Sequence, residues 1–290
     1  MNKKNQIKPA LIVCAVMALL IVVAFVITSL INRNVVKNTK GTMIYVVEAS
    51  GKQELMTYDF REKKESSTGI KSDSIKDACY CDGSIAFIAD NKVGLYNTQA
   101  NSTEYFTMEE EAEYISIDFE DNTLCLGYRI GSKYLVDIIE LKNGRISGEN
   151  LGEIAGKLKG ICIYDNSVFY VADNSKESVF GEITFNTKTQ NSILKTNDGK
   201  FTDLSIKSRN MFLVEQKNSD LVVVSYDFNK KKVNDEKTQE SDKKINTVAA
   251  VYSRKYLAAS EDGIYVCNGS NMQKVELSNL SKLKVLDYME

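Results

Sequence analysis

Four aspartates occupy strand-like segments of this sequence in positions where their carboxylates could form one binding site. They are Asp77, Asp118, Asp203 and Asp287, with Cys79, Cys162 and Ser205 among them at alternating positions. Alternating side chains of a strand share one face, so these groups would converge if the segments surround a common axis. Four carboxylates on such an axis could hold Ca²⁺ or a cationic ligand. The alternative is that they are ordinary polar residues that cap turns or meet water in a channel.

Other kinds of chemistry have little support in the residue types present. The chain has no histidine, which excludes Ser-His-Asp and Cys-His catalysis and imidazole metal ligands. No dinucleotide-binding glycine motif, P-loop or EF-hand loop occurs. We therefore expect no catalytic residues and no cofactor. A carboxylate-based hydrolase or lyase is retained as the least favoured alternative.

The cysteines beyond residue 40 do not form a recognisable framework. They are Cys79, Cys81, Cys125, Cys162 and Cys267. Their odd number and irregular spacing do not indicate a disulfide scaffold, and no pair has zinc-ligand spacing. We expect free, buried thiols.

Charge is distributed unevenly along the chain. Residues 1–40 contain six Lys or Arg and no Asp or Glu, so residues 41–290 carry 31 basic and 39 acidic side chains, a net charge of −8. A domain of that charge lacks the basic footprint of a nucleic-acid binder. Nucleic acid is excluded as a partner.

The segment 9–31 is 23 residues long and carries no charge, which is enough for a membrane-spanning helix. It predicts an uncleaved signal anchor, which contacts membrane lipid, between a basic tail (1–8) and a linker (32–40). A cleaved signal peptide would need a shorter apolar region and a small-residue cleavage site, and the lipoprotein-like residues 11–14 have a large valine before the cysteine. Three basic residues flank each end, so the positive-inside count is tied. The short tail favours a cytoplasmic N-terminus and an exported domain in a bacterial cell.

A sequence pattern that consists of a strand end, a polar turn and a new apolar strand recurs along residues 41–290. Its copies are 81–89, 120–127, 164–172, 207–214 and 252–259. The second residues of these copies are spaced by 39, 44, 43 and 45 positions. In a further copy upstream the corresponding residue is Thr39, which lies 43 positions before Asp82. Each copy is typical of a β-hairpin and is followed by two more strand-like segments.

Four strands per period of this length are typical of a β-propeller blade. In this layout residues 41–290 resemble the broad WD40-like and quinoprotein-like propeller superfamilies. The chain has no Trp and no WD40, kelch or YWTD signature, so no functional residues carry over from a family. The copy at Thr39 lacks an inner strand, and residues 283–288 resemble the inner-strand segment 158–163. We therefore predict an all-β, six-bladed propeller closed by N- and C-terminal strands in one blade; a β-sandwich is the alternative.

The fold indicates a class of function without naming a ligand. Propeller rims consist of loops suited to protein contact, so we predict an extracytoplasmic scaffold or recognition module with a protein partner in an envelope assembly. The alternative is a protein that binds a surface glycan or small ligand at the channel mouth. The charged segments 108–113 and 229–244 are expected to be solvated loops, and either could be a docking loop.

Overall fold

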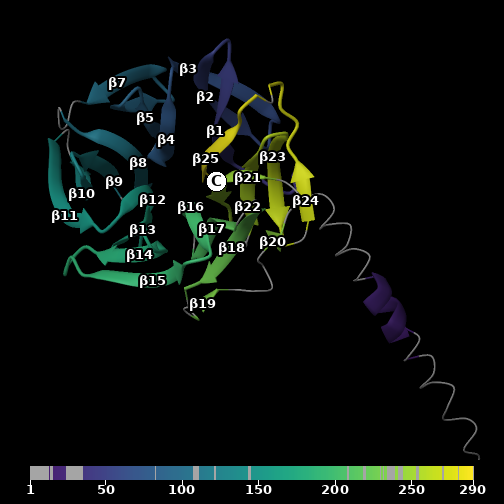
Figure 1. The fold of residues 1–290 in the computed structure, drawn as a ribbon. Coiled ribbons are helices and arrows are strands. Elements are labelled where there is room, and N and C mark those ends of the chain that lie inside the picture. Colours follow the sequence, from purple (N-terminus) through teal and green to yellow (C-terminus); the bar gives the residue numbers. More distant parts are fainter. Residues whose placement is uncertain are drawn as a thin grey trace, which may run out of the picture.

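In the part of the chain that the structure describes, the strands form six antiparallel sheets arranged as a ring (Figure 1). The structure, a computed structural model, describes residues 13, 16–23 and 35–289 except 82, 107–110, 121, 143–144, 208, 218–219, 229, 231, 234–238, 241–243, 253–254, 270 and 280. The sheets are the blades of a six-bladed β-propeller, which confirms the predicted fold class.

The blades follow one another along the chain. Blade 1 contains β25 (Lys284–Met289), β1 (Thr42–Ala49), β2 (Lys52–Asp59) and β3 (Lys64–Ser72). Blade 2 contains β4 (Ile75–Cys81), β5 (Ser84–Ala89), β6 (Lys92–Asn97) and β7 (Ser102–Phe106). Blade 3 contains β8 (Glu113–Glu120), β9 (Thr123–Ile130), β10 (Lys133–Lys142) and β11 (Arg145–Ile154).

The remaining blades repeat the same order of strands. Blade 4 contains β12 (Lys157–Tyr164), β13 (Ser167–Asp173), β14 (Ser178–Thr184) and β15 (Gln190–Thr196). Blade 5 contains β16 (Gly199–Lys207), β17 (Asn210–Lys217), β18 (Asp220–Asp227) and the short strands β19 (Lys232–Val233) and β20 (Gln239–Glu240), which both pair with β18. Blade 6 contains β21 (Ile245–Ala250), β22 (Lys255–Ser260), β23 (Gly263–Asn268) and β24 (Asn271–Lys274).

The hairpins that the sequence repeat predicts are present. The turn between β12 and β13 places Asp165 at φ 50° and Asn166 at φ 60°, and positive φ at both central residues is typical of a type I′ hairpin turn. Aspartate and asparagine tolerate this conformation better than other non-glycine residues. The polar pair therefore fixes where the inner strand of blade 4 ends.

Burial between blades explains the long apolar strands. All six side chains of β5 are buried, because both faces of each sheet pack against neighbouring sheets. The apolar residues form one cluster at each of the six interfaces between blades; for example, one cluster joins blades 1 and 6 and another joins blades 1 and 2. The ring therefore depends on every blade having two neighbours.

The C-terminal strand closes the ring as predicted. β25 is antiparallel to β1, with Met43 opposite Tyr288 and Thr42 opposite Met289. Leu283, Val285 and Tyr288 are buried at 1–2% exposure, whereas Leu286 is partly buried. The difference arises from a bulge in β25, which shifts the register between Ile44 and Tyr45.

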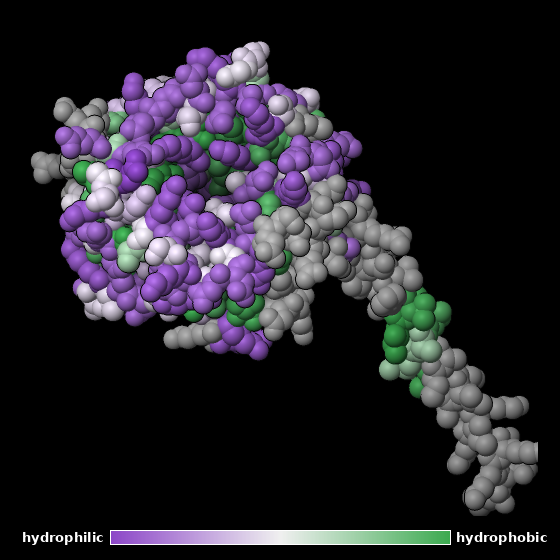
Figure 2. Space-filling view, viewed as in Figure 1, coloured by the Kyte–Doolittle hydropathy of each residue, from purple (hydrophilic) through white to green (hydrophobic). Residues whose placement is uncertain are grey.

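The innermost strands surround the axis and give the ring two distinguishable faces. In ring order these strands are β25, β4, β8, β12, β16 and β21. We call the face where they begin the N face and the face where they end the C face. Figure 2 shows a hollow near the middle of the ring with hydrophilic residues around it.

Most of the predicted anchor 9–31 lies outside the described residues. Residues 16–23 are helical, and their apolar side chains are exposed, as at Leu19 (64%) and Ile21 (66%) (Figure 2). Among the described residues, no helix is both long and apolar enough to cross a membrane.

The two segments predicted as solvated loops are only partly described. Residues 108–110 of the first segment and most of 229–244 lie outside the described residues. In the first segment the prediction is wrong at Ala112, which is buried at 3% exposure, and at Glu113, which begins β8. Where 229–244 is described, the prediction is wrong in part, because β19 and β20 lie within it and extend the sheet of blade 5.

Candidate functional site

An axial cavity of about 80 Å³ lies between the inner strands of all six blades. All four predicted aspartates line it, together with Cys79, Cys162 and Ser205. The convergence expected from strand alternation is therefore present. A cavity of this volume has room for a few water molecules and is too small for a sugar or a peptide.

The carboxylates do not point freely into this cavity, because each accepts hydrogen bonds from the next inner strand. Asp77 Oδ2 accepts bonds from Ser116 Oγ (2.5 Å) and the Ile117 N–H (3.0 Å). Three more bonds of this kind are Ile163 N–H to Asp118 Oδ2 at 2.9 Å, Val248 N–H to Asp203 Oδ2 at 2.7 Å, and Tyr80 N–H to Asp287 Oδ2 at 2.8 Å. We call the interface between two neighbouring inner strands a seam; aspartates thus bridge four of the six seams between blades.

The two other seams are joined by side chains at equivalent places. The Val285 N–H donates to Thr247 Oγ1 at 2.9 Å between blades 6 and 1, and Cys162 Sγ donates to the Leu204 carbonyl at 3.6 Å between blades 4 and 5. Side-chain acceptors on inner strands satisfy N–H groups that would otherwise be buried without a partner. These axial side chains form a closed belt around the ring.

Burial changes the protonation of this belt. Desolvation raises the pKa of Asp118 to about 8, and the negative charge of Asp287 adds to the effect. Desolvation likewise raises the pKa of Asp203 to about 8 and that of Asp77 to about 6. The hydrogen bonds from backbone N–H groups oppose these shifts without cancelling them. At neutral pH, Asp118 and Asp203 are therefore largely neutral.

The axial carboxylates do not form a metal cage in the structure. Among the described residues, no group of three or more Cys, Asp or Glu side chains is placed to hold a metal ion. Each of the four carboxyls already accepts a hydrogen bond from a neighbouring blade, whereas a Ca²⁺ site gathers 6–8 oxygen ligands around one point. The arrangement supports a role in joining the blades better than a role in Ca²⁺ binding.

The five described cysteines are free and buried, as predicted. Desolvation and nearby aspartates raise the pKa of Cys79 and Cys162 well above the ordinary value. Neutral, buried thiols are poor nucleophiles. Cys162 acts here as a hydrogen-bond donor within the belt.

The sequence interpretation missed Lys207, the last residue of β16. Although burial acts to lower the pKa of Lys207, the charges of Asp287 and Asp118 raise it. This lysine places a positive charge near the C-face end of the axis. Lys207 continues the alternation of Asp203 and Ser205, and extending that pattern by one step would have found it.

A second and larger cavity, of about 460 Å³, opens on the N face where blades 2, 3 and 4 meet. It is lined by Lys76, Glu113, Ile115, Arg129, Tyr134, Lys157, Leu158 and Lys159. Lys76, Ile115 and Lys159 also line the axial cavity, so the two adjoin. We call this cavity the N-face pocket.

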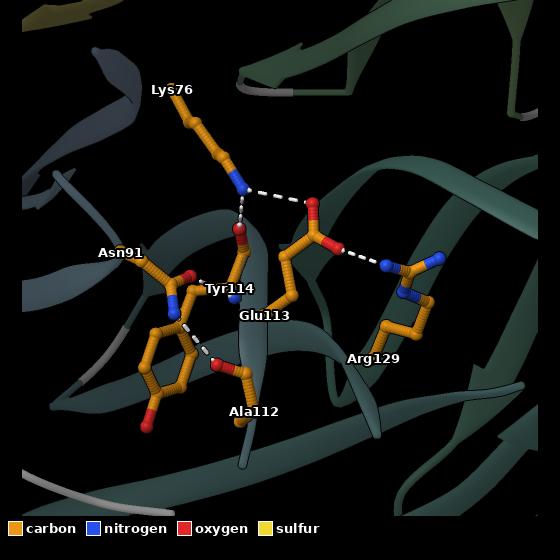
Figure 3. A network of polar contacts seen from close by, with 6 residues as sticks. All are labelled: Lys76, Asn91, Ala112, Glu113, Tyr114 and Arg129. Atoms are coloured by element: carbon orange, nitrogen blue, oxygen red, sulfur yellow. Dashed lines mark hydrogen bonds and ion pairs between the residues drawn. The ribbon is translucent and has the colours of Figure 1, made fainter. Parts of the chain in front are cut away.

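Glu113 organises one side of the N-face pocket (Figure 3). Its Oε1 lies 3.3 Å from Lys76 Nζ and its Oε2 lies 2.5 Å from Arg129 Nη2. Lys76 Nζ also donates to the Tyr114 carbonyl at 2.7 Å. The hydrogen bond from Lys76 lowers the pKa of Glu113, and the nearby positive charges act in the same direction. Glu113 is therefore a carboxylate that holds two cations in place.

Comparison with known proteins supports the architecture and gives no family. No protein-family model and no curated protein matches the sequence. TolB from Acinetobacter baumannii has a TM-score of 0.68 at 12% identity over 85% of this chain and 67% of that chain. A chain of a nidogen/laminin complex has a TM-score of 0.67 at 10% identity over 86% and 97% of the two chains. A TolB-like protein from Agrobacterium tumefaciens has a TM-score of 0.61 at 9% identity over 82% and 90%.

The chain has the six-bladed propeller fold. At these identities the likeness concerns the fold alone, because unrelated functions occur on the same scaffold. The function of the propeller must therefore be inferred from its own surfaces, among which the N-face pocket has five charged side chains in its lining.

Proposed function

We propose that this chain is a membrane-anchored recognition module that binds a protein partner on the N face of its propeller. The observation that supports this proposal is the position of residues 35–40, which join the anchor segment to β1. They pack on the C-face side of blades 1 and 6, so the N face is directed away from the point of attachment.

Several contacts fix this attachment. Val35 is buried at 2% exposure in the cluster between blades 1 and 6. The Val36 N–H donates to Gln273 Oε1 at 3.0 Å, and the Tyr288 hydroxyl donates to the Lys40 carbonyl. The linker thus ends in a docked segment at the closure of the ring, which would hold the propeller in a limited range of orientations.

An anchored propeller with one face turned outward fits the geometry of recognition. One structure with the same fold was solved in a complex between two proteins, nidogen and laminin. A carboxylate-based hydrolase has less support, because the axial carboxylates are occupied by seam hydrogen bonds. Binding of a protein needs no reactive group, only a complementary surface.

The proposal includes a membrane location, with residues 9–31 as the anchor and the propeller outside the cytoplasm. We expect a cysteine introduced as Lys133→Cys to react, in intact cells, with a thiol reagent that cannot cross membranes. Lys133 is exposed, whereas the five described native cysteines are buried, so labelling should depend on the substitution. Labelling that requires cell lysis would instead place the propeller in the cytoplasm.

The use of the N face is tested by photocrosslinking in living cells. A benzophenone amino acid at Ser132, in the exposed turn between β9 and β10 on the N face, should give a defined adduct with another protein. The matched position is Asn186, exposed after β14 on the C face, where we expect no such adduct. Adducts from Asn186 alone, or from neither position, would refute binding through the N face.

A further inference from the structure

The N-face pocket reverses the charge of the domain around it. Residues 41–290 have a net charge of −8, yet the pocket contains four cationic side chains and one carboxylate. The cations are Lys76, Arg129, Lys157 and Lys159, and the carboxylate is Glu113. A local excess of one charge in a concave site attracts ligands of the opposite charge.

The excess of cations remains after the internal ion pairs are counted. Glu113 is shared between Lys76 and Arg129. Lys159 lies 3.4 Å from Asp173 Oδ2, and its side chain keeps 31% of its exposure. Lys157 is exposed and forms no ion pair with any described residue. The pocket can therefore accept further negative charge without first breaking an internal pair.

Strand geometry explains why these cations gather at one place. Lys76 and Lys159 each occupy the extra position of a bulge, between Ile75 and Asp77 in β4 and between Leu158 and Gly160 in β12. A bulge redirects the side chain of the additional residue. Two inner strands thus place a lysine at the mouth of the axis instead of within a blade.

Two hydrogen bonds from the side chain of Asn91 hold the backbone on either side of Glu113. Asn91 Nδ2 donates to the Ala112 carbonyl at 2.8 Å, and Asn91 Oδ1 accepts from the Tyr114 N–H at 2.9 Å (Figure 3). Both backbone groups adjacent to Glu113 are therefore tied to blade 2. A site whose charges are positioned in advance pays less entropy when a ligand binds.

The chemistry of the lining favours carboxylates over neutral sugars. Sugar hydroxyls need paired donors and acceptors, but lysine and arginine side chains only donate. The side-chain acceptors of the lining are Glu113, which two cations already occupy, and the Tyr134 hydroxyl. The apolar part of the wall comes from Ile115 and Leu158. Asp and Glu side chains fit this lining, because their carboxylates can accept from the lysines and the arginine while their methylene groups contact Ile115 and Leu158.

We propose that the N-face pocket binds an acidic segment of the protein partner, with neighbouring Glu or Asp carboxylates placed between Lys157, Lys159 and the Lys76–Arg129 pair. This inference rests on the proposed function and names the chemistry by which the N face recognises its partner. The adjoining axial cavity, at about 80 Å³, is too small to admit the segment. The partner would therefore stop at the mouth of the axis.

A cavity on the C face, between blades 4 and 5, does not offer the same selection. This cavity, of about 360 Å³, is lined by Tyr164, Phe169 and Phe228 with Asp165, Glu182 and Arg209. Two carboxylates and one cation would repel an acidic segment. The negative charge of an acidic segment therefore favours the N-face pocket over this cavity.

The test is a titration of the full-length chain in detergent with a fluorescein-labelled hexaglutamate peptide, followed by fluorescence polarisation at low ionic strength. We expect saturable binding that the variant Lys157→Gln/Lys159→Gln weakens by about tenfold or more, since it removes two of the four cations that would meet the peptide carboxylates. The matched control, Lys64→Gln/Lys232→Gln, removes the same charge from exposed positions on the outer strands β3 and β19. It should bind like the parent protein.

Other ligands and the melting temperature complete the test. Hexalysine should not bind. The two double variants should melt within a few degrees of the parent, because Lys64, Lys157 and Lys232 are exposed and Lys159 is partly exposed. Equal weakening by both double variants would show nonspecific attraction and refute the pocket. Tighter binding of trigalacturonate than of hexaglutamate would also overturn the proposal, by showing a site for an acidic glycan.

The outcome is distinguishable from that of the crosslinking experiment. If the parent protein shows no saturable binding of hexaglutamate but gives the adduct at Ser132, the acidic segment is refuted and partner binding on the N face is kept. Specific peptide binding without an adduct in cells would refute the proposed function and leave the pocket as an anion site.

Discussion

Removal of residues 281–290 is expected to unfold the propeller at room temperature or to make it aggregate. The deletion removes β25 together with Leu283, which lies just before it. The side chains of Leu283, Val285 and Tyr288 are buried, with only 1–2% of their surface exposed. Burial of each large apolar side chain stabilises by roughly 1.5–3 kcal/mol, so the three contribute about 4.5–9 kcal/mol as an upper bound. Domains are typically stable by only about 5–15 kcal/mol.

The same deletion also opens the belt and exposes an edge. It removes the bond from the Val285 N–H to Thr247 and the bond from the Tyr80 N–H to Asp287, which join blade 1 to both neighbours. β1 would then present an unpaired edge, and such edges promote aggregation.

Circular dichroism melting and size-exclusion chromatography of the full chain in detergent would measure the effect. Removal of only residues 289–290 is the matched control, because it leaves Tyr288 in place. A synthetic peptide of residues 281–290 should restore part of the melting transition by pairing with β1. If the longer deletion melted within a few degrees of the parent, closure by β25 could not be the support of the ring.

The architecture was predictable because its signals are local and repeated. A polar turn such as Asp165–Asn166 between two apolar strands specifies a hairpin without reference to the rest of the chain. The repeat length also appears in the seams, since Asp118 and Ile163, like Ser205 and Ala250, are separated by 45 residues. One repeat along the chain corresponds to one blade around the axis.

The roles of the site residues were less accessible from the sequence. Alternation placed Asp77, Asp118 and Asp203 on the axis correctly, yet it could not show that an N–H of the next blade would occupy each carboxylate. The N-face pocket is formed by β4, β8, β9, β10 and β12, which come from three blades, and it depends on the bulges at Lys76 and Lys159. Bulges shift register by one residue and leave no simple mark in a hydrophobic pattern.

Buried neutral carboxyls give the propeller a stability that depends on pH. For Asp118 and Asp203, the folded-state pKa of about 8 lies above the ordinary value of about 3.9 for an unfolded chain. Between these values the folded state holds protons that the unfolded state has released. Stability contributed by the two groups is therefore present at acidic pH and is lost as the pH rises towards 8.

Neighbouring charges modify this dependence without reversing it. Asp118 faces the charges of Asp287 and Lys207, and Asp203 faces those of Asp77 and Lys284. Asp287 and Asp77 further raise the pKa of the carboxyls they face, and Lys207 and Lys284 lower it. The pKa of Lys207 is itself raised, so its charge is lost only at strongly alkaline pH, outside this range.

We expect the melting temperature of the full chain to fall by about 8 °C or more between pH 6 and pH 8.5. A loss of roughly 2 kcal/mol for each of the two carboxyls follows from their shifts, and 1 kcal/mol corresponds to about 2–4 °C in a domain of this size. The variant Asp118→Asn/Asp203→Asn keeps an oxygen to accept each seam bond and cannot ionise, so its melting temperature should stay nearly constant over the range. Asp73→Asn/Asp198→Asn, at exposed positions, should follow the parent profile. A parent protein that becomes more stable from pH 6 to pH 8.5, or an axial variant with the parent profile, would show that these carboxyls are ionised in the folded ring.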